Sequence, residues 1–168
     1  MEKLDSRFVS IYKRPEFGAQ CQEILNDVLN LDNAYWVNRS EVNQNYGIDG
    51  DVGIYDCLHD AAMPMLLKDA IKKVIPKCYA FPLREVMINR YRKDTGFMPM
   101  HVDNVGSLGV IIINLTTSDK DGFSYINESG DEKLITDSAG NAIAFKKIKL
   151  KHKVDTVSED RYSLICLY

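Results

Sequence analysis

Two side chains that can bind a metal are separated by a single residue in the stretch YRKDTGFMPMHVDN, residues 91–104. They are Asp103 and His101, one of only three histidines in the chain. In an extended strand, residues i and i+2 point to the same side, so the imidazole and the carboxylate would share one pocket. Taken alone, the pair is also explained by a surface histidine that shares a hydrogen bond with an aspartate.

A second histidine, His152, lies in the alternating stretch KIKLKHKV. Leu150 and Val154 share its face of the predicted strand, whereas lysines occupy the other face, so His152 is expected to point inward. An isolated inward histidine is more often a hydrogen-bonded core residue than a ligand. Together with His101 and Asp103, however, it would complete two imidazoles and one carboxylate, a facial triad that suits non-haem Fe(II).

An arginine begins the last predicted strand, RYSLICLY, residues 161–168. Arg161 and Ser163 share one face of this strand with Ile165 and Leu167. An arginine in an apolar row is unusual unless an anion meets it. Its planar fork matches a carboxylate, and the neighbouring hydroxyl can add a further hydrogen bond. The alternative is an arginine whose head reaches water from the start of the strand.

The elements that must position these residues differ between the two halves of the chain. The first half predicts two helices, PEFGAQCQEILNDVLNL and MPMLLKDAIKKVI. Pro15 suits the first turn of the first helix, and Pro76 ends the pattern of the second. The apolar stripes predicted to face the core are Phe17, Cys21, Ile24, Leu25 and Val28 in the first helix, and Leu66, Leu67, Ala70, Ile71 and Val74 in the second.

From about Arg84 onward, short β-rich runs alternate with turn residues. The runs are REVMINRY, LGVIIINL, GFSYIN, NAIAF, KIKLKHKV and RYSLICLY. Strands behind two helices predict an α+β, mainly β fold: a double-sheet sandwich or jelly roll with the N-terminal helices packed on one sheet. An open α+β sheet is the alternative.

Size and composition favour one globular domain over residues 1–168, with helical support at about 15–80 and a β core at about 84–168. Apolar residues make up 45% and charged residues 27%, and the net charge of −3 argues against a broadly basic surface for nucleic acid. The N-terminal sequence is charged, and the longest apolar run, LGVIII, is too short to span a bilayer. We therefore expect a cytoplasmic protein with no membrane partner. Four cysteines without a CxxC pair are predicted to be reduced and buried: Cys21, Cys57, Cys78 and Cys166.

Taken together, these motifs resemble those of the Fe(II)- and 2-oxoglutarate-dependent dioxygenases. The HxD…H motif of that superfamily matches His101, Asp103 and His152, and its RxS motif matches Arg161 and Ser163. The spacing is most similar to the prolyl hydroxylase branch, in particular the hypoxia-inducible-factor prolyl hydroxylases. As in those enzymes, a tyrosine stands ten residues before an HVDN sequence, and an arginine follows the distal histidine by nine residues. The resemblance extends over residues 84–168.

The resemblance implies a double-stranded β-helix, the jelly roll of that superfamily, and an enzyme that uses Fe(II), 2-oxoglutarate and O2, with ascorbate as a supporting reductant. It implies that His101, Asp103 and His152 hold the metal. The distal carboxylate of 2-oxoglutarate would bind to Arg161, assisted by Ser163 and Tyr91. Such an enzyme hydroxylates a C–H bond and releases succinate and CO2. A protein or peptide substrate, with proline as the first candidate residue, follows from the prolyl hydroxylase likeness.

Two asparagines are further candidates for binding the cosubstrate. Asn114 stands where the prolyl hydroxylases have a tyrosine that reaches the distal carboxylate, so it could replace that tyrosine. Asn89 belongs to the sequence Asn89-Arg90-Tyr91, which resembles the NxY that DNA-repair dealkylases of the same superfamily place before their HxD motif. Those enzymes carry a second arginine where this chain has Leu167.

Three alternatives to protein hydroxylation therefore remain open. A nucleobase substrate ranks below a peptide because of Leu167, although a phosphate backbone could meet the lysines of the KKIKLKHK stretch, namely Lys146, Lys147, Lys149, Lys151 and Lys153. A solvated strand face is the commoner meaning of such lysines. A small-molecule substrate and a non-catalytic jelly-roll module that binds a metal or a small acid are the others. The sequence YGIDGDVGIYD predicts a loop near the substrate entrance, and the oligomeric state is left open.

Overall fold

The structure is a computed structural model that describes residues 9–40, 53–76, 82–103, 109–145 and 150–168. Most of the predicted entrance loop, together with Cys78, Asn104 and the lysines Lys146, Lys147 and Lys149, lies outside these ranges. The helices are η1 (Pro15–Phe17), α1 (Gly18–Leu29), η2 (Asn33–Tyr35), η3 (Asp60–Ala62) and α3 (Met65–Val74). The strands are β1 (Val9–Tyr12), β2 (Val37–Asn38), β3 (Asp56–His59), β4 (Glu85–Tyr91), β5 (Met98–His101), β6 (Val110–Asn114), β7 (Gly122–Ile126), β8 (Glu132–Thr136), β9 (Ala142–Phe145), β10 (His152–Val154) and β11 (Arg161–Leu167).

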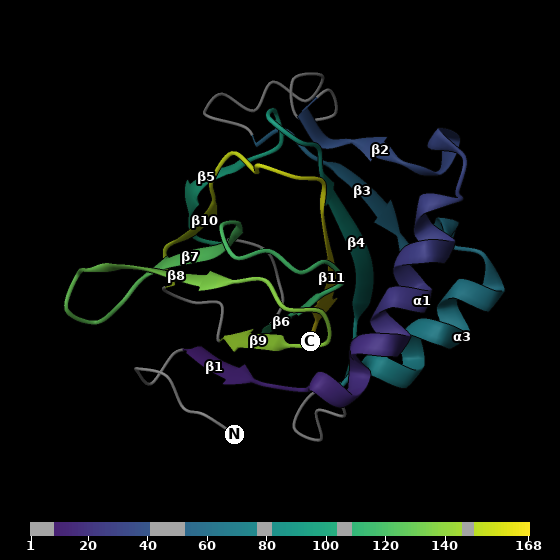
Figure 1. The fold of residues 1–168 in the computed structure, drawn as a ribbon, viewed down its shortest axis with the longest axis horizontal. Coiled ribbons are helices and arrows are strands. Elements are labelled where there is room, and N and C mark those ends of the chain that lie inside the picture. Colours follow the sequence, from purple (N-terminus) through teal and green to yellow (C-terminus); the bar gives the residue numbers. More distant parts are fainter. Residues whose placement is uncertain (1–8, 41–52, 77–81, 104–108, 146–149) are drawn as a thin grey trace.

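These strands form two sheets. The larger sheet has seven strands in the order β1-β9-β6-β11-β4-β3-β2, and the smaller has four in the order β5-β10-β7-β8. From β4 to β11 the chain passes repeatedly from one sheet to the other: β4, β6, β9 and β11 belong to the larger sheet, and β5, β7, β8 and β10 to the smaller. This winding is the double-stranded β-helix that the sequence predicted. Figure 1 shows the smaller sheet on the left and the helices against the larger sheet on the right.

Helices α1 and α3 cover the outer face of the larger sheet, as predicted (Figure 1). Pro15 opens η1, whose chain continues directly into α1. Buried residues from both helices share one core with the sheet, and this core contains Cys21, Ile24, Leu25, Val28, Leu67, Ile71, Val74, Ile88, Ile113 and Leu164. One predicted member of the stripe is wrong: Leu66 is 83% exposed. It lies one residue, or about 100° of helix rotation, from Leu67, which points into the core.

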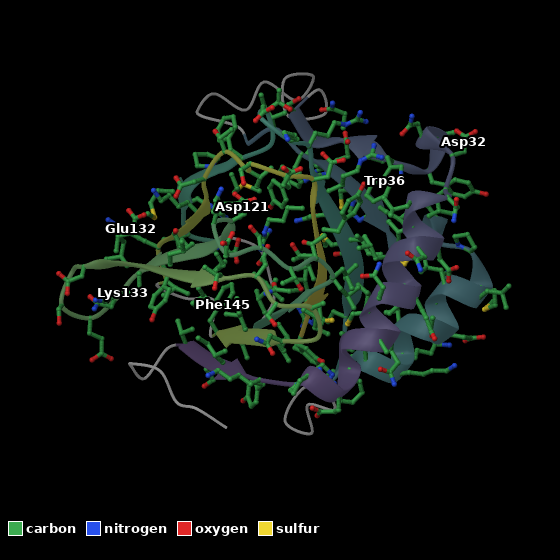
Figure 2. All side chains as sticks on the ribbon, in the orientation of Figure 1. Asp32, Trp36, Asp121, Glu132, Lys133 and Phe145 are labelled. Carbon is green, nitrogen blue, oxygen red and sulfur yellow. The ribbon has the colours of Figure 1, made fainter. Side chains whose placement is uncertain are left out.

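Alternate residues of β11 serve two different environments. Tyr162, Leu164 and Cys166 face the helical side and belong to its core. Ile165 and Leu167 face the other sheet, where they pack with residues such as Phe123 and Phe145. Figure 2 labels Phe145 between β9 and the strands of the smaller sheet, and its ring lies 5.4 Å from that of Phe123 on β7. The period-two pattern in the sequence thus separates a helix-facing core from an inter-sheet space.

Four strands of the structure were not predicted from the sequence, namely β1, β2, β3 and β8. The strand that was expected to hold both His101 and Asp103 is β5, but it ends at His101, so Asp103 lies beyond it. The four strands that were missed have five residues or fewer, but so do the predicted β6, β7, β9 and β10, so length alone does not explain the difference. The remaining predicted strands lie where expected, except that β10 includes only the last three residues of KIKLKHKV, of which residues 147–149 are outside the described ranges.

Three of the four cysteines are described, and Cys21, Cys57 and Cys166 are buried free thiols, as predicted. Burial raises the pKa of Cys57 to about 12, which keeps that thiol protonated. Within the described ranges, the structure contains no helix with the length and apolar character that a membrane crossing requires.

Candidate functional site

The antiparallel pairing of β5 with β10 brings two histidines together. His101 and His152 are direct partners across these strands, and their ring centroids lie 4.2 Å apart. Asp103, two residues beyond β5, reaches both of them: its Oδ1 is 3.4 Å from Nε2 of His101, and its Oδ2 is 3.8 Å from Nε2 of His152. One ligand atom from each of the three residues lies within 4.8 Å of the others. The three predicted ligands therefore converge in space.

Backbone carbonyls fix which ring nitrogen of each histidine is free. Nδ1 of His101 lies 2.8 Å from the carbonyl oxygen of Pro99, and Nδ1 of His152 lies 3.0 Å from that of Leu150. Because a carbonyl oxygen only accepts, each Nδ1 must carry the proton and donate it. Nε2 is then the nitrogen that each ring turns toward Asp103. His101 hydrogen-bonds Asp103 while Nε2 carries a proton, and once that proton is lost Nε2 has the lone pair that a metal ligand requires.

The two histidines differ in their surroundings. Burial lowers the pKa of His152, and the neighbouring His101 lowers it further. The ring of His152 stacks on Phe123 at 5.2 Å and contacts Phe145 at 5.1 Å, so aromatic packing fixes its plane. Burial also lowers the pKa of His101, but hydrogen bonds to Asp103 and Pro99 more than offset this and leave it raised.

A cavity of about 530 Å³ extends from this cluster into the space between the sheets. One part of its wall is polar, with Tyr91, Arg161 and Ser163 as neighbours on β4 and β11. The other part is apolar and consists of Met87, Val110, Ile112, Phe123, Phe145, Ile165 and Leu167. An elongated ligand that enters beside the histidines could therefore place a polar group against Arg161 while the apolar wall excludes water.

The anion that meets Arg161 in this structure is another residue of the chain, Asp137. Nε of Arg161 donates to Oδ2 of Asp137 at 2.6 Å, and Nη2 donates to Oδ1 at 3.1 Å. Nη1 donates to Oγ of Ser163 at 2.9 Å. Burial lowers the pKa of Arg161, but the Asp137 carboxylate outweighs this effect and raises it, so the guanidinium is charged. The alternative in which the head of Arg161 reaches water is wrong, since its side chain is buried.

Two asparagines flank Ser163 on the neighbouring strands. Asn89 on β4 and Asn114 on β6 are both direct partners of Ser163 on β11, so the three side chains share one face. Both amide atoms of Asn114 are buried without a hydrogen-bond partner, and so is Oδ1 of Asn89. Such atoms in a folded protein call for a partner, and a bound polar ligand is one. Asn114 is not among the residues that line the cavity as the structure has it, whereas Asn89 is.

Tyr91 lies at the junction of the metal cluster and the polar wall. The Arg161 guanidinium lies 5.3 Å from the centre of its ring, and the ring of Tyr55 stacks on it at 5.6 Å. Burial raises the pKa of the Tyr91 hydroxyl, so Tyr91 is a neutral hydrogen-bonding group. Its side chain also hydrogen-bonds that of Asn89.

The cavity also contains residues that the sequence did not single out. Arg39 and Tyr55 line it, and the two side chains hydrogen-bond each other. Asp137 contacts Arg161 from 24 residues away in the chain. None of the three lies in a recognisable spacing pattern, and no signal in the sequence could have identified them. His59, the third histidine, is apart from the cluster and pairs with Glu85 at 2.9 Å.

No family model matches the sequence, and the search of curated proteins also finds no match. Solved structures do match in fold. A prolyl-4-hydroxylase from Pseudomonas putida aligns with a TM-score of 0.71 at 17% identity and covers 95% of this chain and 91% of its own. A prolyl hydroxylase from Trichoplax adhaerens, solved with a peptide fragment of the hypoxia inducible factor oxygen degradation domain, aligns with a TM-score of 0.71 at 13% identity, with 97% and 84% coverage.

A third neighbour was solved with a metal ion and 2-oxoglutarate bound. HygX from Streptomyces hygroscopicus, with nickel and 2-oxoglutarate bound, aligns with a TM-score of 0.63 at 13% identity and covers 94% of this chain and 81% of its own. At these identities the likeness establishes the fold. The chain therefore has the double-stranded β-helix of 2-oxoglutarate oxygenases, with its own His-Asp-His cluster inside it.

Proposed function

We propose that this chain is an Fe(II)- and 2-oxoglutarate-dependent oxygenase that hydroxylates a C–H bond of a peptidyl residue, with proline as the first candidate. The observation that carries the proposal is the convergence of His101, Asp103 and His152 on a cavity whose lining also includes the charged Arg161. Two imidazoles and one carboxylate are the donor set that suits non-haem Fe(II) and leave further coordination positions open.

The metal fits the residues that would hold it. His101 and His152 each offer a Nε2 lone pair, because each Nδ1 already donates to a backbone carbonyl. Asp103 adds one negative charge and an oxygen ligand between them. When bound, Fe(II) would supply the chemistry that couples O2 and 2-oxoglutarate to oxidation of the substrate, with succinate and CO2 as co-products. The aromatic rings of Phe123 and Phe145 would hold His152 in place.

The polar wall of the cavity is suited to the distal carboxylate of 2-oxoglutarate. Arg161 has five N–H groups, of which Asp137 takes two and Ser163 one, so two are left for a ligand. The Ser163 hydroxyl and the unpaired Asn114 amide add donors next to them. Tyr91 and Asn89 complete this wall. Their role toward the cosubstrate is part of the proposal.

A peptide substrate is favoured by the type of enzyme to which the fold is similar. Two of the neighbours are prolyl hydroxylases, one of them with a peptide bound, and the Tyr91, HVDN and Arg161 spacing resembles that branch. The test is to incubate the purified protein with a library of proline-containing peptides. Each hydroxylated peptide would gain one oxygen atom, and tandem mass spectrometry would locate it. If succinate forms but no peptide is modified, the oxygenase assignment stands and the peptidyl-proline substrate is refuted.

The oxygenase itself is tested by NMR detection of succinate from 2-oxoglutarate with Fe(II), ascorbate and air. We expect succinate from the wild type and at least a hundredfold less from His101→Ala, because one of three ligands is lost. His59→Ala is the matched control, since His59 pairs with Glu85 outside the cluster and its loss should leave turnover unchanged. Absence of both succinate and metal-dependent 2-oxoglutarate binding would refute the assignment and favour a non-catalytic module.

A further inference from the structure

The Arg161–Asp137 pair is the most buried ion pair near the cavity, with each residue only 3% exposed. A guanidinium removed from water needs a partner of opposite charge, and the carboxylate that pairs with it here comes from the turn between β8 and β9. This inference rests on the proposed function, because it concerns how Arg161 would present itself to the cosubstrate.

Asp137 could compete with the cosubstrate for Arg161, or it could hold Arg161 in place for it. The residues that line the cavity distinguish between these two roles. Arg161 and Ser163 line the cavity, whereas Asp137 is not among its lining residues. The carboxylate therefore meets the guanidinium from the side away from the space that a ligand would occupy. A competing anion would have to lie on the ligand side.

The backbone around Asp137 anchors its carboxylate. Its N–H donates to the carbonyl oxygen of Asp121 at 3.1 Å, and its own carbonyl accepts from the N–H of Ser118 at 3.1 Å. Asp137 thus has a fixed main chain and a short side chain with few rotamers. Its two oxygens take Nε and Nη2 of Arg161 in a fork that allows one orientation of the planar guanidinium.

We propose that Asp137 is a positioning residue of the cosubstrate site: it holds the Arg161 guanidinium in one plane, so that the two N–H groups left over are presented to the distal carboxylate of 2-oxoglutarate. Both oxygens of Asp137 accept hydrogen bonds from Arg161, which requires an ionised carboxylate, so the pair carries no net charge. Recognition of the carboxylate then depends on directed hydrogen bonds from Arg161 and Ser163 rather than on an excess positive charge. A guanidinium that is free to rotate would bind the cosubstrate more weakly even though its own charge is unchanged.

The experiment is calorimetric titration of 2-oxoglutarate into the Ni(II)-loaded full-length protein, where nickel replaces iron so that no turnover occurs. Asp137→Asn keeps the size of the side chain but breaks the fork. We expect it to raise the Kd for 2-oxoglutarate about tenfold or more, the loss expected for one charge-assisted hydrogen bond, with the Kd for Ni(II) unchanged. Asp69→Asn is the control, because Asp69 only forms an exposed ion pair with Lys72 on α3.

A second variant separates position from charge. Asp137→Glu retains the carboxylate and displaces it by one methylene, and it should also weaken 2-oxoglutarate binding; it serves as well if Asp137→Asn fails to fold. In an Arg161→Gln background, Asp137→Asn should change the Kd less than about twofold, since Asp137 acts through Arg161. The inference would be overturned if the folded Asp137 variants had an unchanged or lower Kd for 2-oxoglutarate. It would also be overturned if Asp137→Asn raised that Kd as much in the Arg161→Gln background as in the wild type. Neither result would affect the proposed function. A wild type that binds no 2-oxoglutarate with Ni(II) would overturn the proposed function with it.

Discussion

Each histidine of the cluster is oriented by the backbone carbonyl of the residue two positions earlier in the chain. His101 uses Pro99, and His152 uses Leu150. The same local contact at both positions engages Nδ1 and turns Nε2 of each ring toward Asp103, where a metal would bind. Asn114, which pairs with Ser163 across β6 and β11, differs from the histidines. The residue is only 1% exposed, and its side-chain amide has no hydrogen-bond partner among the described residues.

Replacement of Asn114 by leucine should separate stability from binding. Asn114→Leu removes unsatisfied buried polar atoms at similar size, so we expect the free energy of unfolding to rise by about 1 kcal/mol in the absence of ligands. The Kd for 2-oxoglutarate should rise at the same time if the amide contacts the cosubstrate. Urea denaturation and calorimetry measure the two effects. In Asn141→Leu, by contrast, the bond from the Arg14 N–H is lost and stability should fall; a similar loss in Asn114→Leu would mean that its amide is satisfied.

At the level of elements, the connections between strands hold the cavity wall in place. Asp121, labelled in Figure 2, precedes β7 and accepts hydrogen bonds from Ser118 and from the backbone and hydroxyl of Ser158, which precedes β11. One carboxylate thus ties the start of β7 in the smaller sheet to the approach of β11 in the larger. The carbonyl oxygen of Asp121 also accepts a hydrogen bond from the N–H of Asp137, the residue that pairs with Arg161.

The tie through Asp121 should depend on pH. Burial raises the pKa of Asp121, but hydrogen bonds from Ser158, Glu159 and Ser118 outweigh it and leave the pKa below its ordinary value of 3.8. A lowered native pKa means that the stabilisation is complete above the ordinary value and is lost as the pH falls through the native one. We expect Asp121→Asn to lower the free energy of unfolding by about 1 kcal/mol at pH 7. Urea denaturation at a series of pH values should show this difference shrinking in acid; a difference that grows in acid contradicts the assignment.

At the level of the whole molecule, the proposed ligands draw on both sheets. His101 and His152 come from the smaller sheet, whereas Arg161 and Ser163 come from the larger. A metal alone would bind one side of the cavity. A cosubstrate that reaches from the metal to Arg161 would connect the two sheets, and its binding energy would add to the stability of the fold.

The effect of 2-oxoglutarate on the Tm should therefore depend on whether the metal is already bound. Ni(II) should raise the Tm, and 2-oxoglutarate should raise it further only when Ni(II) is present, by an increment that corresponds to about 2.7 kcal/mol at a hundredfold excess over its Kd. Arg161→Gln should keep the nickel increment and lose the second one. Differential scanning fluorimetry measures both. An equal effect of 2-oxoglutarate on the metal-free protein would argue against binding through the metal.

The sequence by itself determined those features that depend on local periodicity and on spacing within one strand. Alternation placed Arg161 and Ser163 on the face opposite Leu164, and the same reasoning turned His152 inward. Runs of strand length behind two helices predicted a double-sheet sandwich or jelly roll, and the motif resemblance specified the double-stranded β-helix. These features were predictable because they need only the period of a strand or a helix and no information about which strands pair.

Only the tertiary structure decided what meets across strands and loops. The register of β5 against β10 brings His101 to His152, and a turn 24 residues away brings Asp137 to Arg161. The sequence predicted an anion for this arginine but could not identify an aspartate of the chain itself as that anion. Pairing between distant segments is set by the packing of the whole core, and so it leaves no periodic signal in the residues that finally touch.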